Sequence, residues 1–356
     1  YIIEKKCINI SNICLPYTKL IEIYFSFLYK KYLYKLYPFL NTAVGNVLDN
    51  TKKIKKIKKD KNIDLIAVAS NWFRKVKNLP FLIKVYKEFP KLKKIIIGLE
   101  INENNKTAEN LNLFEEINSL PNTTILPKIP YDKLQEYISS ARLLLITSIS
   151  ESGPNVLLEA FYQNCQVISS KNIGFFNLVN KKILCNSCYN LDEWKNKIDY
   201  IFKNYDNLKI SEIDNIPKNE EHKMIEFITH NKVVNNSKIK VVFVSCDVPN
   251  HGGSATNTYN LYMNLNQYID CYCIFISNID YEIKPENKDR FFVIKVEEIN
   301  LIMDNVKKKI SKGTPIDIVF FKNYKVYVYI FMYFKNIIKL FSPSGLRGIN
   351  KIVSEN

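Results

Sequence analysis

The chain has 356 residues, of which 47% are hydrophobic and 24% are charged, a globular composition that excludes full disorder and a length that suits about two domains. No stretch reaches the ~18 uncharged apolar residues of a membrane-spanning helix. The net charge is +16, but the excess is mostly lysine in a chain also rich in asparagine, isoleucine and tyrosine. We therefore interpret the charge as a compositional bias and expect no nucleic-acid partner.

The first 62 residues predict a helical and basic lead-in, which we interpret as the remnant of a preceding domain. Aromatic residues crowd the segment from Tyr24 to Tyr37, and a basic run follows at residues 51–61. A second aromatic segment extends from Tyr324 to Phe334. Both aromatic segments could dock on a membrane surface, and buried helices explain them equally well. We expect a cytoplasmic protein, with peripheral membrane contact left open.

Residues 63–205 alternate apolar strands with helices. The predicted strands are residues 63–70, 93–99, 123–129, 142–148 and 166–170, and the predicted helices are residues 80–89, 110–120, 131–141, 155–164 and 192–205. Strands that are apolar almost throughout indicate a parallel sheet covered on both faces. This segment therefore predicts an α/β domain with a doubly wound, Rossmann-like parallel sheet.

A polar segment at residues 206–237 interrupts this rhythm and contains Pro217, so it predicts a linker with one helix. Residues 238–356 then start a second α/β unit. Its predicted strands are residues 239–245, 271–277, 290–296, 317–323 and 337–343, and its main predicted helices are residues 260–268 and 299–311. We expect a second Rossmann-like domain that is truncated.

The eight cysteines are too sparse for a disulfide scaffold, and we expect reduced thiols. Cys185 and Cys188 form one C-x-x-C pair. A structural zinc site needs four ligands, and no second pair has suitable spacing. We expect no metal site and no cofactor.

The most informative stretch is a strand, a turn and a helix between residues 142 and 164. The strand ends at Ser148, Glu151 lies in the turn, and the helix starts near Asn155 with Glu159 inside it. In parallel α/β sheets, ligands bind beyond the carboxyl ends of the strands.

The same turn predicts an anion site. Gly153 and Pro154 precede the helix, and glycine lets a ligand approach the backbone closely. The free amides of Asn155, Val156 and the next residue can bind a phosphate. Two carboxylates on either side of a diphosphate site suit the sugar and the ribose of a nucleotide sugar.

The sequence ESGPNVLLEAFYQNCQVISS, residues 151–170, resembles the donor-site signature of the retaining glycosyltransferases of the GT-B fold, in particular glycosyltransferase family 4, the group 1 type. The resemblance implies that Glu151 contacts the donor sugar and Glu159 the ribose. In this family an arginine and a lysine after the first strand hold the diphosphate. Lys77 is at the lysine position, and Asn71 replaces the arginine, for which Arg74 is the candidate substitute.

The sets of residues that follow from this resemblance are small. The candidate catalytic residues are Glu151, Lys77 and Arg74, and the candidate donor-binding residues are Glu159, Gly153, Pro154, Asn155, Val156 and Ser148.

The second unit resembles the acceptor-side domain of the same enzymes. Its first predicted strand is followed by a glycine loop of Gly252, Gly253 and Ser254, with Thr256 or Asn257 expected to cap the next helix. In the family, this loop faces the donor phosphates. We interpret His251 as a surface residue, and for Arg347 an anion contact and a solvated turn stay equally open.

The function implied is transfer of a sugar from a nucleotide-diphosphate sugar to a hydroxyl of a glycan, lipid or protein, with retention of configuration and without a metal. In the family the acceptor domain comes first, whereas here a donor-type domain precedes an acceptor-type one. A fragment that joins two tandem transferases explains this order, and a permuted enzyme is the alternative. A catalytically incomplete nucleotide-sugar-binding fragment and a basic nucleic-acid-binding protein are the competing functions.

Overall fold

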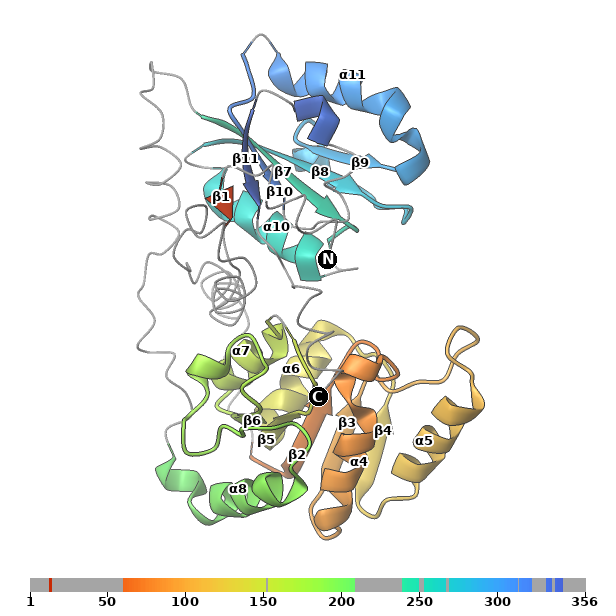
Figure 1. Cartoon of the computed structure of the whole chain (residues 1–356), viewed down its shortest axis with the longest axis vertical. Helices are drawn as coiled ribbons and strands as arrows, with labels where there is room; N and C mark the ends of the chain where they lie inside the picture. The colour runs from red at the N-terminus through yellow and green to blue at the C-terminus, as the bar shows by residue number, and fades with distance from the viewer. Residues whose placement is uncertain are drawn as a thin grey trace. The chain divides into compact units, whose positions relative to one another are not determined.

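The computed structural model describes residues 13–14, 60–151, 153–208, 239–249, 253–266, 269–312, 314–321, 331–334 and 337–341. The chain divides into two compact units, Val47–Pro217 with Val353–Asn356 and Tyr1–Asn46 with Lys218–Ile352 (Figure 1). We call them the β2–β6 unit and the β7–β11 unit after their strands. Among the described residues, no helix is long and apolar enough to cross a membrane.

The β2–β6 unit is built on a parallel sheet of five strands in the order β4-β3-β2-β5-β6. The strands are β2 (Ile63–Val68), β3 (Lys94–Ile97), β4 (Thr123–Leu126), β5 (Ala141–Ile146) and β6 (Gln166–Ser169). The predicted doubly wound sheet is therefore confirmed. Its winding direction reverses between β2 and β5, so the loops after these two strands flank the position where such sheets bind ligands.

The helices of this unit form two groups, as right-handed crossovers on either side of the reversal require. One group contains α4 (Leu79–Glu88), α5 (Ala108–Asn118) and α8 (Leu191–Lys203), and the other contains α6 (Tyr131–Ser140) and α7 (Asn155–Tyr162). Helix α7 starts at Asn155, as the sequence predicts. Trp194 of α8 packs edge-on against Phe81 of α4, with ring centroids 5.4 Å apart.

The β7–β11 unit contains a parallel sheet of six strands in the order β1-β11-β10-β7-β8-β9. These strands are β1 (Ile13–Cys14), β7 (Lys240–Cys246), β8 (Asp270–Ile276), β9 (Phe291–Ile294), β10 (Ile318–Phe321) and β11 (Ile338–Phe341). The second Rossmann-like sheet is thus confirmed as well. Strand β1, from the lead-in, pairs with β11 of this sheet. Residues 1–12, 15–59 and 209–238, with most of the predicted lead-in and linker, lie outside the described residues.

Helix α10 (Gly253–Leu265) begins earlier than the predicted start at residue 260. Thr256 and Asn257 therefore lie inside the helix, and the prediction that one of them caps it is wrong. A glycine pair after a strand predicts a turn. Ala255 and Thr258 are fully buried, and this packing extends the helix toward its amino end despite the low helix propensity of glycine.

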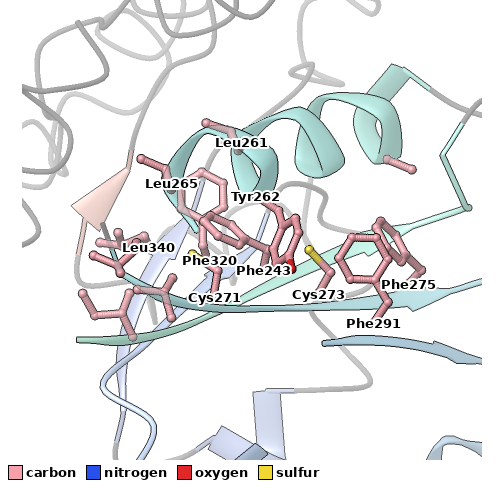
Figure 2. Close-up of a cluster of buried hydrophobic side chains, with 14 of the residues drawn as sticks. Phe243, Leu261, Tyr262, Leu265, Cys271, Cys273, Phe275, Phe291, Phe320 and Leu340 are labelled. Atoms are coloured by element: carbon pink, nitrogen blue, oxygen red, sulfur yellow. The ribbon is translucent and has the colours of Figure 1, made fainter. Parts of the chain in front are cut away.

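Aromatic and aliphatic side chains fill the space between α10 and the sheet (Figure 2). Tyr262 and Leu265 of α10 lie over Phe243 of β7 and the cysteines of β8. The ring of Phe291 on β9 packs edge-on against the rings of Tyr262 and Phe275. The ring centroids are 4.7 Å apart for Tyr262 and 5.7 Å apart for Phe275. These contacts bind the helix to three neighbouring strands.

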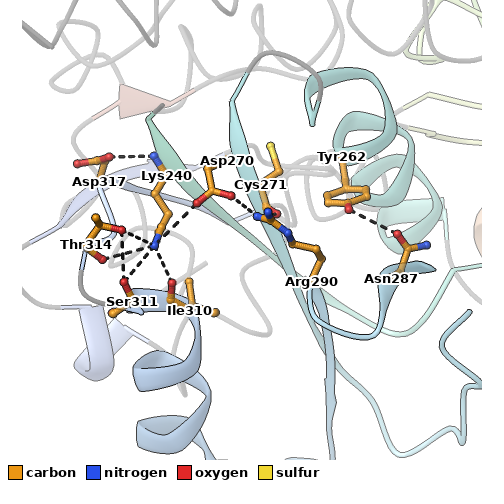
Figure 3. A network of polar contacts seen from close by, with 10 residues as sticks. All are labelled: Lys240, Tyr262, Asp270, Cys271, Asn287, Arg290, Ile310, Ser311, Thr314 and Asp317. Atoms are coloured by element: carbon orange, nitrogen blue, oxygen red, sulfur yellow. Dashed lines mark hydrogen bonds and ion pairs between the residues drawn. The ribbon is translucent and has the colours of Figure 1, made fainter. Parts of the chain in front are cut away.

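A polar network lies near the amino ends of the strands, on the face of this sheet that α10 does not cover (Figure 3). The Lys240 ammonium group donates to the Ile310 carbonyl at 2.8 Å and to Thr314 Oγ1 at 2.7 Å, at the carboxyl end of α11 (Ile299–Ser311). Burial lowers the pKa of Lys240, while Asp270 acts in the other direction. Asp270 is in turn paired with Arg290. The network explains how a lysine fits at the start of a buried strand.

We predict that Phe291→Ala destabilises the β7–β11 unit by ~3–5 kcal/mol, because it leaves a cavity among several rings. Phe292→Ala, at the half-buried neighbour on the opposite face of β9, is the matched control. Thermal and urea unfolding followed by circular dichroism measures both. Equal losses for the two variants would contradict the role of Phe291.

Candidate functional site

Backbone hydrogen bonds join the two loops at the reversal of the β2–β6 sheet. The amide of Ile149, after β5, donates to the carbonyl of Val76, after β2, at 2.8 Å. The Thr147 hydroxyl donates to the carbonyl of Lys77 at 3.2 Å. The two loops therefore keep a fixed spacing.

Lys77 and Glu151 meet between these loops. Lys77 Nζ lies 2.7 Å from Glu151 Oε1, and the side chains are 12% and 24% exposed. The Ser148 hydroxyl donates to Glu151 Oε2 at 3.0 Å. The structure thus brings together three residues that the sequence placed in one site.

Backbone contacts also hold Glu151 from its other side. Its carbonyl accepts from the Gly174 amide at 2.7 Å, and its own amide donates to the Asn172 carbonyl at 3.2 Å. The position of this carboxylate is therefore fixed from two segments that are distant in sequence.

Asn78 fixes the backbone directly after Lys77. It has a φ of 56°, in the left-handed region, between the 3₁₀ turn Lys75–Lys77 and α4. Asparagine tolerates this conformation better than most residues. Its side-chain amide donates to the Cys188 carbonyl at 3.2 Å. Sequence reasoning missed this contact. The feature that could have indicated it is the pair Lys77 and Asn78 directly before α4.

Of the C-x-x-C pair, Cys188 supports this loop through its backbone carbonyl. Cys185 and Cys188 are free and buried, and burial raises the pKa of both thiols, to about 12 for Cys185. Within the described part of the chain, no cluster of three or more His, Cys, Asp or Glu side chains could hold a metal ion.

The amino end of α7 lies directly after Glu151 in the chain. Pro154 precedes the helix and is buried, and no side chain caps it. Gly153, Asn155 and Val156 are partly buried. The first amides of a helix lack acceptors within it, so those of Asn155 and Val156 are donors for an anion. Ser152 lies outside the described residues.

Arg74 is not part of the Lys77–Glu151 ion pair. It is exposed, just before the 3₁₀ turn, and no ion pair joins it to another described residue. The Asn71 side chain accepts from the Phe73 amide at 3.0 Å and so shapes the same loop.

Glu159 is one helical turn further along α7 and is only 8% exposed. The Gln135 side chain donates to its Oε2 at 3.2 Å, and the Tyr131 hydroxyl is a second hydrogen-bond partner. Burial raises the pKa of Glu159 from its ordinary value of 4.5 to about 7, although both partners act to lower it. Neither partner follows from the sequence, apart from the position of a glutamine on the buried side of α6.

The glycine loop of the second unit is only partly described. Gly253 and Ser254 are the first residues of α10, and Gly252 lies outside the described residues. His251 and Arg347 lie outside them too.

Residues 49–226, half of the chain, match the model of a protein family described as glycosyl transferases group 1. The chain belongs to this family. The match includes Lys77, Glu151 and Glu159, and it confirms the resemblance identified from the sequence. No curated protein matches this group 1 glycosyltransferase chain in sequence.

Several solved structures are similar to parts of the chain. Sucrose-phosphate synthase from Thermosynechococcus elongatus is 16% identical with a TM-score of 0.43, over 56% of this chain and 52% of that one. Anabaena HepE in complex with UDP is 12% identical with a TM-score of 0.40, over 55% of each chain. WaaG, a glycosyltransferase involved in lipopolysaccharide biosynthesis, is 15% identical with a TM-score of 0.34, over 60% and 62%. The chain thus spans about half the length of the solved proteins it matches.

We predict that the raised pKa of Glu159 makes the β2–β6 unit less stable as pH rises. The folded state keeps a proton that the unfolded chain releases above pH 4.5, so the free energy of unfolding falls between about pH 4.5 and pH 8. The loss is about 3 kcal/mol, and Glu159→Gln should abolish it.

Urea unfolding at several pH values, followed by tryptophan fluorescence, measures this dependence. Both tryptophans of the chain, Trp72 and Trp194, belong to the β2–β6 unit, so the signal reports on the correct part. The same pH dependence in wild type and Glu159→Gln would contradict the prediction.

Proposed function

We propose that the β2–β6 unit binds the donor of a retaining glycosyltransferase, a nucleotide-diphosphate sugar whose sugar passes to a hydroxyl acceptor. The observation that carries this proposal is the Lys77–Glu151 pair beside the amino end of α7, at the reversal of the sheet. Membership of the group 1 family supports it.

Each group has a chemical role in this proposal. The departing diphosphate gains negative charge as the glycosidic bond breaks, and the Lys77 ammonium group and the first amides of α7 stabilise it. Glu151 accepts hydrogen bonds from hydroxyls of the sugar. Because these positive groups come from the protein itself, we propose that no metal is needed.

In the structure, the charge of Lys77 is engaged by Glu151 at 2.7 Å. A diphosphate carries more negative charge than one carboxylate, so it would draw the ammonium group toward itself and free Glu151 for the sugar. Arg74, exposed on the same loop, is the second cation that we propose for the diphosphate.

Glu159 is the proposed partner of the ribose, one turn along α7 from the anion-binding amides. We propose that the acceptor is a hydroxyl of a glycan, a lipid or a protein.

The test is incubation of the chain with UDP-, GDP- and ADP-sugars. We expect one nucleotide class to raise the melting temperature of the β2–β6 unit, with slow hydrolysis of its sugar and release of the anomer that retains the donor configuration. Nuclear magnetic resonance of the fresh product identifies the anomer. Stabilisation without hydrolysis would favour a catalytically incomplete binding fragment, and release of the inverted sugar would contradict retention.

We predict that Lys77→Ala lowers donor hydrolysis by roughly 10²–10³-fold, because a charge that stabilises the leaving diphosphate is removed. Lys75→Ala is the matched control, since Lys75 is exposed in the same 3₁₀ turn. Initial rates at saturating donor measure the effect. Equal rates for Lys77→Ala and Lys75→Ala would remove Lys77 from the diphosphate site.

A further inference from the structure

The carboxylate of Glu159 is almost closed off from solvent by two residues of helix α6. Glu159 itself is 8% exposed, and it accepts hydrogen bonds from Gln135 and Tyr131. These two residues are four positions apart, so they lie on one face of α6, which packs against α7. The ribose site of the proposed function is therefore shared between two helices.

Gln135 is fixed deep inside the unit. It is fully buried, and its Nε2 donates to Glu159 Oε2 at 3.2 Å. Its Oε1 accepts from the side chain of Gln163 at 3.3 Å. An ionised carboxylate only accepts hydrogen bonds, and Gln163 already donates to Gln135 Oε1, so the amide group of Gln135 faces Glu159.

Tyr131 is the outer partner of the same carboxylate. It is the first residue of α6 and is 44% exposed, yet its hydroxyl is hydrogen-bonded to Glu159. Tyr131 is the exposed one of the two partners, so a ribose hydroxyl that approaches this carboxylate from solvent competes with the Tyr131 hydroxyl. Tyr131 has solvent to move into, whereas the buried Gln135 has none.

On the basis of the proposed function, we propose that Gln135 is a positioning residue that aims the Glu159 carboxylate at the ribose of the donor, and that the Tyr131 hydroxyl is exchanged for a ribose hydroxyl when the donor binds. The exchange replaces one O–H donor by another, so Glu159 keeps two hydrogen bonds throughout. Donor binding then depends on displacing a group of the protein itself.

Few other charges act on Glu159. From α6, Tyr131 contacts it, and Asp132 acts on Tyr131. On β5 the charged residue is Arg142, which pairs with a carboxylate on β2 at 3.7 Å. Strand β6 has no titratable residue, and α7 itself adds Tyr162. The protonation of Glu159 is therefore controlled mainly by its burial and by the two hydrogen bonds from α6.

The experiment measures the affinity for UDP, GDP and ADP and for their 2′,3′-dideoxy analogues by calorimetry between pH 6 and pH 9. For each nucleotide, we divide the affinity for the ribonucleotide by the affinity for its dideoxy analogue. This affinity ratio isolates the ribose hydroxyls, because the phosphates ionise equally in both ligands. In wild type we expect this ratio to rise with pH as Glu159 ionises.

Gln135→Met keeps the length of the side chain and removes the hydrogen bond to Glu159. We expect it to lower the ratio by about tenfold at pH 7 and to move the pH midpoint upward, because the ionised carboxylate loses a donor. The matched control is Gln166→Met. Gln166 is equally buried in this unit and donates to the Leu208 carbonyl at 3.2 Å, so the ratio should not change.

Tyr131→Phe removes the competing hydroxyl at an exposed position. At pH 9, where Glu159 is ionised in both proteins, we expect the ribonucleotide to bind about threefold to tenfold more tightly, with no change for the dideoxy analogue.

An unchanged ratio and midpoint in Gln135→Met would overturn the positioning role, and weaker or unchanged binding in Tyr131→Phe would overturn the exchange. A wild-type chain that binds none of the three nucleotides would overturn the proposed function and this inference with it. If the wild-type chain binds a nucleotide and Gln135→Met has the wild-type affinity ratio, this inference alone is overturned.

Discussion

The ion pair between Lys77 and Glu151 joins two loops that are 74 residues apart in the chain and only 2.7 Å apart at these side chains. The pair is partly buried, and the cost of desolvating both charges offsets much of their attraction, so the pair depends on its scaffold. The scaffold is the reversal of the sheet between β2 and β5, together with the backbone bond from Ile149 to Val76. Every other part of the candidate site is positioned relative to these two loops.

Glu159 is a second constraint, because burying a carboxylate without a cation is unfavourable. Its neighbours Leu158 and Ala160 are fully buried, so the helix cannot turn it to solvent without exposing apolar surface. A buried carboxylate whose pKa is raised by desolvation is a candidate for a functional role. Helix α6 lessens the desolvation cost of Glu159 through two hydrogen bonds, one from the buried amide of Gln135 and one from the hydroxyl of the exposed Tyr131.

The main polar clusters of the two units lie at opposite ends of their strands. In the β7–β11 unit, Lys240 and Asp270 form a buried polar network at the amino ends of the strands, where it supports the carboxyl end of α11. In the β2–β6 unit, the site residues gather at the carboxyl ends, where the crossovers of a parallel sheet leave space for a ligand. The distinction separates polar groups that stabilise the fold from those of the candidate site.

The sequence by itself determined both parallel sheets, the start of α7 at Asn155 and the family, because these depend on local patterns of apolar residues and on the short spacing of Glu151 and Glu159. The tertiary structure decided the rest. Contacts between segments far apart in sequence determine three features: the early start of α10, the pairing of β1 with β11, and the hydrogen bond from Gln135 to Glu159. Periodicity records which face of a helix is buried, and only the packed fold determines what that face meets.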